Sequence, residues 1–165
     1  MANYDFNKKV LILTGASGGI GKATMKYFFN CGASLAVTYN RNEEVKALAM
    51  ELDPTQGRIL TEQVDVTSSE ECNNFAQQCL ERYGHADFLV NNAGVLRISA
   101  VEVTSNELWR QVIATNLDSV FYMCRAFIPI LRQGGAIVNI GSAAAHRGAI
   151  DHSAYAASKA AVLTF

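Results

Sequence analysis

The sequence has no long apolar run and no block of like charges. Its 165 residues carry 14 basic and 15 acidic side chains, which gives a formal net charge of −1. A general nucleic-acid or acidic-membrane binder needs a basic face, so this balance argues against both functions. No segment approaches the roughly 18 apolar residues that a bilayer-spanning helix requires. We therefore expect the chain to bind neither nucleic acid nor membrane.

Cysteine and histidine are few and scattered. The four cysteines include no close pair at the spacing of metal ligands, and the three histidines are also dispersed, so we expect no metal site. We interpret the thiols as reduced and buried in a cytoplasmic protein. The amino-terminal segment has only the apolar run "VLIL" before Thr14, which is too short for a secretory signal. The cysteines are Cys31, Cys72, Cys79 and Cys124.

Short apolar runs alternate with helical segments along the whole chain, without internal repeat or linker. This pattern predicts one domain over residues 1–165. Strands are expected at 8–14, 34–39, 58–66, 87–92 and 135–142, and helices at 20–31, 42–52, 68–84, 104–116, 117–133 and from 153. Such alternation indicates right-handed βαβ crossovers and a parallel sheet covered on both faces. The sequence therefore predicts a doubly wound α/β domain in which all five strands, including 135–142, are buried.

Local signals set the expected helix ends. Ser68 with Glu71 and Thr104 with Glu107 have the spacing of capping boxes at the start of a helix. Pro129 should kink or shorten the helix at 117–133 near its end, because proline lacks the N–H that a helix interior needs.

A glycine-rich turn, "TGASGGIGKAT" (14–24), stands between the first expected strand and the first helix. Glycines let a pyrophosphate approach the backbone closely, and the helix amino terminus adds unpaired N–H donors. The turn is not a P-loop, because Ala23 stands where the magnesium-binding hydroxyl would be. We interpret the turn as a nucleotide site, with a simple tight turn as the alternative.

Four features in order resemble the classical short-chain dehydrogenase/reductase family, and the resemblance covers the whole chain. They are "TGASGGIG" (14–21), "NNAG" (91–94), Asn116 at the start of "NLDSVF", and Ser142 followed by "YAASK" (155–159). Gly18 also permits the glycine spacing of the extended branch, which includes sugar epimerases, but "NNAG" favours the classical branch. The resemblance implies a three-layer Rossmann fold.

The resemblance also implies an oxidoreductase that interconverts a carbonyl and a secondary alcohol by hydride transfer with NAD(P). Its substrate would be a small molecule, and its relatives are usually homo-oligomers, tetramers or dimers. An activity like that of 3-oxoacyl-acyl-carrier-protein reductase is the commonest, and sugar or polyol dehydrogenases come next. The rival interpretation is a non-catalytic nucleotide-binding module or an inactive fragment.

The end of the second expected strand, "VTYNRNEE", bears on the choice of cofactor. It offers Asn40 and Arg41 and no acid before Glu43, which suits a 2′-phosphate and favours NADP(H) over NAD(H). Arg41 as a solvated residue and Asp65 as a turn residue are the alternatives. By resemblance, the cofactor-binding residues are Gly15, Ser17, Gly19, Ile20, Gly21, Asn40, Arg41, Asp65, Val66, Asn92, Ala93, Gly94, Tyr155 and Lys159.

Tyr155 and Lys159 stand four positions apart, so on a helix they share one face. A free phenol holds its proton at pH 7 by roughly 4 kcal/mol, and a nearby ammonium favours the phenolate. Tyr155 is thus the expected general acid/base, and Ser142, at the carboxyl end of the fifth expected strand, can hold the substrate oxygen. The resemblance gives Asn116 a role in a water relay to Lys159. The alternatives are a core-edge tyrosine, a strand-end cap at Ser142 and a helix-junction cap at Asn116.

Family members continue for about 80 residues beyond the point that corresponds to Phe165. We therefore expect a fragment of a full-length reductase that lacks the last strands of the family and its substrate lid. The alternative is that another chain supplies the missing part.

Overall fold

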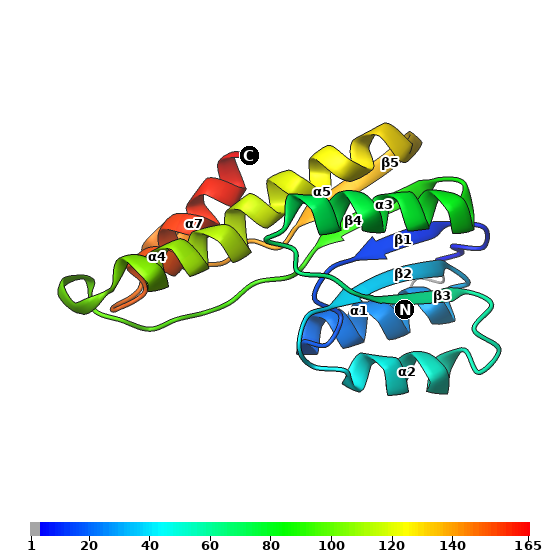
Figure 1. Ribbon diagram of the computed structural model, residues 1–165, viewed down its shortest axis with the longest axis horizontal. Helices are drawn as coiled ribbons and strands as arrows, with labels where there is room; N and C mark the ends of the chain where they lie inside the picture. The colour runs from blue at the N-terminus through cyan, green and yellow to red at the C-terminus, as the bar shows by residue number, and fades with distance from the viewer. Residues whose placement is uncertain (1–3) are drawn as a thin grey trace.

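Five parallel strands form a single sheet in the order β3-β2-β1-β4-β5 in the computed structural model, which describes residues 4–165 (Figure 1). The strands are β1 (Val10–Leu13), β2 (Ser34–Tyr39), β3 (Ile59–Gln63), β4 (Ala86–Asn91) and β5 (Leu131–Asn139). The chain winds outward from β1 in one direction and then, after β3, crosses to β4 and β5 on its other side. The predicted doubly wound fold is confirmed.

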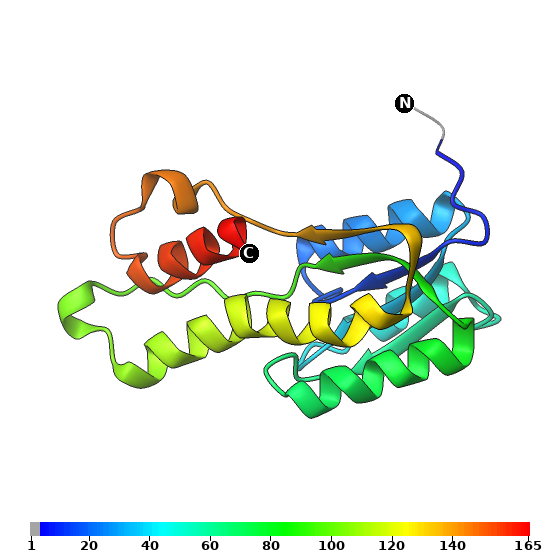
Figure 2. The same ribbon diagram turned by 90° about the horizontal axis from the view of Figure 1, so that it is seen from above.

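Helices cover both faces of this sheet, which gives three layers (Figures 1 and 2). The α-helices are α1 (Gly19–Asn30), α2 (Glu44–Leu52), α3 (Ser69–Tyr83), α4 (Asn106–Ile113), α5 (Ser119–Phe127), α6 (Ala144–Arg147) and α7 (Ser153–Thr164). Short 3₁₀ turns occupy η1 (Val101–Val103) and η3 (Ile128–Ile130), and a π-helical turn, η2 (Ala114–Asp118), joins α4 to α5. No helix in the described part of the chain is long and apolar enough to cross a bilayer.

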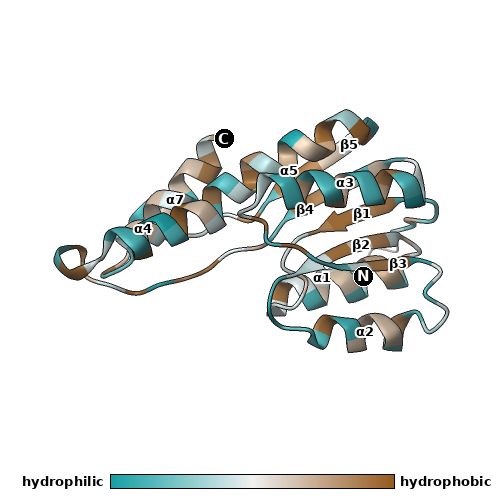
Figure 3. Ribbon diagram, in the orientation of Figure 1, coloured by the Kyte–Doolittle hydropathy of each residue, from teal (hydrophilic) through white to brown (hydrophobic). Residues whose placement is uncertain are grey.

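The central strands are buried because their apolar side chains meet helices on both faces. In β1, Val10 and Ile12 join a cluster with α3 and α5, whereas Leu11 and Leu13 join a second cluster with α1 and α2. Figure 3 shows these strands as apolar ribbons between helices that turn hydrophilic faces outward. A run without polar alternation is therefore what a strand at the centre of this fold requires.

The fifth strand differs from the prediction. It begins at Leu131, ends at Asn139 and lies at an edge of the sheet, where several of its side chains are exposed, including 49% of Val138. The expectation of a fifth buried strand was therefore wrong. Its pairing with β4 is irregular, since Ala86 pairs with Leu131 but Phe88 pairs with Ala136.

The helix predicted at 117–133 was too long. Its α-helical part ends at Phe127, and Pro129 lies in the 3₁₀ turn η3, after which the chain extends into β5. The helix is shortened near Pro129, as predicted, but it ends at Phe127, earlier than expected. At its start, the π turn η2 makes the two helices predicted at 104–116 and 117–133 nearly continuous.

One predicted cap is confirmed and the other is displaced by one residue. The Ser68 hydroxyl accepts the Glu71 N–H at 3.2 Å, although the Glu71 carboxylate accepts from Asp65 N–H instead of closing the box on Ser68. At α4 the cap is Ser105, which accepts the Leu108 N–H at 3.2 Å. Thr104 was the wrong choice because its hydroxyl donates backwards to Ala100 O at 2.8 Å.

Candidate active site

A cleft of about 640 Å³ opens at the carboxyl ends of the strands, where the chain leaves β1 toward β2 on one side and β4 lies on the other. Ligands of doubly wound sheets bind at this kind of crossover point. Of the predicted cofactor residues, all line the cleft except Gly21, Tyr155 and Lys159. The lining residues are Gly15, Ser17, Gly18, Gly19, Ile20, Asn40, Arg41, Asn42, Asp65, Val66, Thr67, Asn92, Ala93, Gly94, Val95, Arg97, Gln111 and Thr115.

Two glycines let the turn after β1 fold tightly under this cleft. Gly15 has a φ of +64°, and a Cβ on it would lie 2.8 Å from Ala93 Cα. A Cβ on Gly21, in the first turn of α1, would lie 2.5 Å from Gly15 O. By contrast, a Cβ on Gly19 would meet nothing within 4 Å, so the space beside that residue is open.

Side chains brace the glycine turn against the segment after β4. The Thr14 hydroxyl accepts the N–H groups of Asn92 and Ala93, both at 3.0 Å. In return, the Asn92 amide donates to Thr14 O at 3.0 Å and to Gly15 O at 2.9 Å. Asn92 was predicted to bind the cofactor, and no sequence pattern predicts this brace, because it joins residues 78 positions apart.

Tyr155 and Lys159 lie one turn apart on α7, at the carboxyl end of β5. Lys159 is only 5% exposed, and its ammonium donates to Ile140 O at 2.6 Å. Burial lowers the pKa of Lys159 below the ordinary lysine value. Tyr155 is half-buried, and its ring lies edge-on to the imidazole of His152 at a centroid distance of 6.4 Å.

Asn116 lies in the π turn η2 and is fully buried. Its Oδ1 accepts the Val95 N–H at 2.8 Å, and its Nδ2 donates to Val95 O and to Ser158 Oγ, each at 3.0 Å. A Cβ on Gly94 would lie 3.2 Å from Asn116 Oδ1 and 3.7 Å from Lys159 Nζ. Gly94, Asn116 and Lys159 therefore meet at one point beside the cleft.

Ser142 follows β5 by three residues and is half-buried. Its hydroxyl oxygen accepts the Ala144 N–H at 3.2 Å, at the start of α6. Like Tyr155 and Lys159, it does not line the 640 Å³ cleft. Hydrogen bonds thus join Asn116 to the helix that carries Tyr155 and Lys159, whereas Ser142 lies on the neighbouring loop.

The chain matches the short chain dehydrogenase family over residues 9–165. It belongs to this family. Similar proteins include the 3-oxoacyl-[acyl-carrier-protein] reductase FabG of Chlamydia muridarum, which is 38% identical over 95% of this chain and 64% of its own length. A 3beta-hydroxysteroid dehydrogenase of Mediterraneibacter gnavus is 35% identical over 95% of this chain and 58% of its own length. The chain thus spans about two thirds or less of these two relatives.

Solved structures of short-chain dehydrogenases superpose closely on the chain. A glucose/ribitol dehydrogenase from Brucella melitensis has a TM-score of 0.94 and 36% identity, with 98% of this chain and 68% of that chain covered. A short-chain dehydrogenase from Burkholderia cenocepacia, solved in complex with NADP, has a TM-score of 0.91 and 31% identity, with 96% and 66% covered.

In this short-chain dehydrogenase fold, the polar residues after β2 and β3 face the cleft. Asn40 and Arg41 are exposed, and Arg41 forms no ion pair within residues 4–165. Asp65 makes a local turn, since its Oδ1 accepts the Thr67 N–H at 2.9 Å and the Thr67 hydroxyl at 2.7 Å. Asp65 therefore stabilises a local turn and also lines the cleft. No cluster of three potential metal ligands occurs in the described residues.

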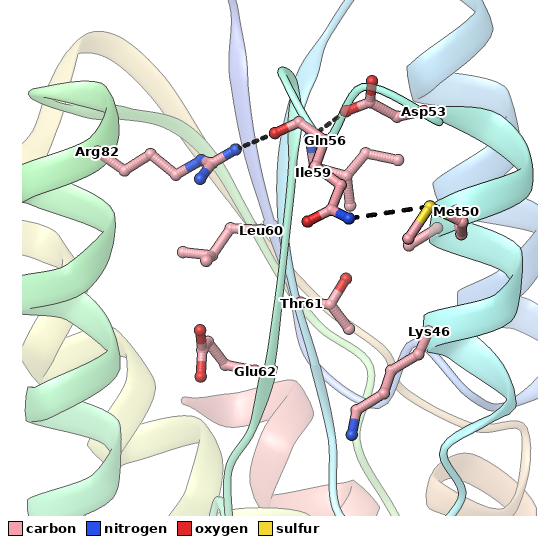
Figure 4. Close-up of a pocket in the computed structure, with 10 residues that line it drawn as sticks. Lys46, Met50, Asp53, Gln56, Ile59, Leu60, Thr61, Glu62 and Arg82 are labelled. Carbon is pink, nitrogen blue, oxygen red and sulfur yellow. Dashed lines mark hydrogen bonds between the residues drawn. The ribbon is translucent and has the colours of Figure 1, made fainter.

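A second cavity of about 350 Å³ lies at the β3 edge of the sheet, between α2 and α3 (Figure 4). Lys46 and Met50 of α2 lie on the same side of β3 as Ile59 and Thr61. Leu60 and Glu62 project to the other side, toward α3, whose Arg82 donates to Gln56 O at 2.6 Å. It contains none of the predicted site residues. We therefore place the candidate active site at the larger cleft beside α7.

Proposed function

We propose that the protein is an NADP-dependent oxidoreductase that interconverts a carbonyl and a secondary alcohol, with Tyr155 as the general acid/base. The observation that carries this proposal is the position of Tyr155 and Lys159 on one face of α7, next to a cleft at the carboxyl ends of the strands. A volume of about 640 Å³ is within the usual range for a small-molecule or cofactor site.

The residues around the cleft fit a dinucleotide. The backbone at Gly18 and Gly19 is open to an incoming phosphate, and the amino terminus of α1 supplies unpaired N–H donors with a positive partial charge. Asp65 and Val66 would border the base, and Asn92 to Gly94 the adjacent ribose. When bound, the nicotinamide supplies or accepts the hydride.

The side chains of α7 and its neighbours would handle the proton. In reduction, the Tyr155 hydroxyl gives its proton to the carbonyl oxygen as the hydride reaches the carbon, and in oxidation the phenolate takes that proton back. The Lys159 ammonium stabilises the phenolate electrostatically. Ser142 would hold the substrate oxygen with its hydroxyl hydrogen, which remains free while its oxygen accepts from Ala144.

The hydrogen bonds of the Asn116 side chain bear on its expected role in a water relay. Both N–H bonds and the oxygen of its amide already have partners, so the side chain has no N–H left to hold a relay water. We propose that the side chain instead fixes the segment at Val95 to α7. A water that connects Lys159 to solvent would then either donate to the second lone pair of Asn116 Oδ1 or bind other groups.

We propose NADP(H) over NAD(H) because the side chains of Asn40 and Arg41 are exposed at the end of β2 and Arg41 has no ion-pair partner within residues 4–165. Among the described residues that line the cleft after β2, none is a carboxylate that would repel a 2′-phosphate. The structures similar to this chain include proteins solved with NADP and with NADPH. Comparing KM for NADPH and NADH tests this choice. Arg41→Ala should raise KM for NADPH by about tenfold and leave KM for NADH within about twofold, whereas a parent that prefers NADH would contradict it.

For the substrate, we propose a 3-oxoacyl thioester, as the FabG relatives of the chain act on 3-oxoacyl-acyl-carrier protein according to their names. A sugar or polyol is the second candidate, because a similar structure is a glucose/ribitol dehydrogenase. We also expect self-association, since Trp109 on α4 and Phe121 on α5 are more than 40% exposed, at 42% and 44%.

The test is cofactor-dependent turnover of a substrate panel by the full-length protein. Tyr155→Phe should lower kcat by roughly 10²-fold or more, because the general acid is lost. Tyr27→Phe, at an exposed tyrosine of α1, is the matched control and should retain the parent rate. Equal turnover by Tyr155→Phe and the parent would contradict the catalytic assignment. Tight NADPH binding without any turnover would instead support the non-catalytic module.

A further inference from the structure

Both N–H bonds of the Asn116 side chain and one lone pair of its oxygen are used in hydrogen bonds. Its oxygen accepts one N–H, from Val95, and its two N–H bonds go to Val95 O and Ser158 Oγ. Asn116 and Ser158 are both 0% exposed, so water cannot replace any of these partners without a local opening. The amide oxygen faces Gly94, where a Cβ would lie 3.2 Å from Oδ1.

Ser158 continues this chain of hydrogen bonds into the helix that carries Tyr155 and Lys159. Its hydroxyl hydrogen goes to Tyr155 O at 2.7 Å, so the same oxygen is free to accept from Asn116 Nδ2 at 3.0 Å. Ser158 directly precedes Lys159, and its bond ends on the backbone of Tyr155. The connection therefore runs from Val95 through Asn116 and Ser158 to the turn of α7 that separates the phenol from the ammonium.

We propose that Ser158 is a positioning residue for the Tyr155 and Lys159 pair. Its hydroxyl fixes that turn of α7 against Asn116 and thereby sets the separation between the two side chains. This inference rests on the proposed function, and no bond is made or broken at Ser158 itself. Loss of the hydroxyl leaves a buried N–H of Asn116 without an acceptor, so the amide or the helix must shift to recover one.

The matched comparison uses two buried serines, Ser158 and Ser119, that both donate to a backbone carbonyl of the preceding helical turn. Ser119 is 3% exposed and donates to Thr115 O at 2.6 Å, but it accepts nothing from Asn116. Ser158→Ala in the full-length protein should lower kcat for alcohol oxidation about tenfold, with KM within about twofold. In the proposed mechanism kcat for alcohol oxidation rises with pH, because the phenolate of Tyr155 is the base. In Ser158→Ala this rise should move to higher pH. Ser119→Ala should change neither quantity.

Two further measurements keep the inference open to refutation. Ser158→Thr keeps the hydroxyl and should restore kcat to within about threefold of the parent, provided that circular dichroism shows a parent-like fold. Amide hydrogen exchange at Val95 should be faster in Ser158→Ala than in the parent, because its acceptor on Asn116 is released. This second readout does not depend on turnover.

The outcomes distinguish a failure of the proposed function from a failure of the inference about Ser158. If Tyr155→Phe turns over like the parent, the proposed function fails, and exchange at Val95 still tests the Ser158 connection. If Tyr155→Phe is inactive while Ser158→Ala has a parent-like kcat and pH profile, the inference about Ser158 is overturned. Unchanged Val95 exchange in Ser158→Ala, or an equal loss of kcat in Ser119→Ala, overturns it as well.

Discussion

Gly19 and Gly21 stand two residues apart in the same turn, yet a methyl group has opposite consequences at each. At Gly21 the Cβ would meet backbone, Gly15 O at 2.5 Å and Ala16 Cα at 2.7 Å, and backbone cannot move aside cheaply. At Gly19 it would enter open space along the cleft. Side-chain size at Gly21 is therefore limited by the fold, and at Gly19 by whatever occupies the cleft.

This contrast gives a paired prediction. Gly21→Ala should lower the free energy of unfolding by about 1–3 kcal/mol, the usual cost of overpacking. Gly19→Ala should leave it unchanged or raise it by up to about 1 kcal/mol, because alanine favours helix, while it weakens NADPH binding. Urea denaturation and a fluorescence titration with NADPH measure the two effects. Equal losses of stability in both variants would contradict the prediction.

At the same scale, the sequence predicted that Tyr155 and Lys159 share a helix but not the hydrogen bonds around them. The four-residue spacing placed Tyr155 and Lys159 on one helix face, and α7 carries both. The partners of Asn116 could not be predicted, because Val95 and Ser158 lie 21 and 42 residues away along the chain. Such bonds depend on the tertiary arrangement of η2, the segment after β4 and α7, which no local pattern encodes.

Among the elements, α2 and the edge strand β3 are joined by one carboxylate. Asp53 follows α2 directly and is 6% exposed. Its Oδ2 accepts the N–H groups of Arg58 at 2.7 Å and Ile59 at 2.9 Å, and its Oδ1 accepts the Thr55 hydroxyl at 3.0 Å. Burial alone would raise the pKa of Asp53, but these hydrogen bonds outweigh it and hold the pKa below the ordinary value.

The lowered pKa predicts the pH dependence of this link. A carboxylate whose pKa is lower in the folded state contributes stability above its unfolded pKa, near 4, and loses it as the pH falls through the folded pKa. Asp53→Asn should therefore cost about 2 kcal/mol at pH 7, and the difference from the parent should shrink below about pH 4. Denaturant unfolding from pH 3 to 7 checks it, with the exposed Asp5→Asn as control. A pH-independent difference would contradict the assignment.

The elements themselves were predicted well where burial decides them and less well where it does not. Strands β1, β2 and β4 follow from apolar runs that meet helices on both faces. The boundary between α5 and β5 was missed because Leu131 and Arg132 suit a helix equally well, and only the pairing of Leu131 with Ala86 makes this segment a strand. Ser105 displaced Thr104 as the cap because Thr104 bonds to the preceding turn instead.

On the scale of the whole molecule, stability is unevenly distributed. Both hydrophobic clusters lie against the sheet, whereas segments 95–105 and 143–152 extend beyond it at one end (Figure 2). These two segments expose large apolar side chains, Val101 at 70% and Ile150 at 87%. They are tied to each other by the Ser99 N–H, which donates to Asp151 O at 2.7 Å. The two segments should therefore open together, as a unit less stable than the sheet.

Amide hydrogen exchange of the parent protein should show this division. We expect amides of β1, β2 and β4 to exchange at least about 100-fold more slowly than those of 95–105 and 143–152, because the buried strands exchange only on global unfolding. NADPH should slow exchange at the glycine turn and at 91–95, which border the larger cleft, more than at β3 beside the smaller cavity. Protection by NADPH that is strongest at β3 would move the nucleotide site to the other cavity. Equal exchange in strands and outer segments would mean that the molecule unfolds as one cooperative unit.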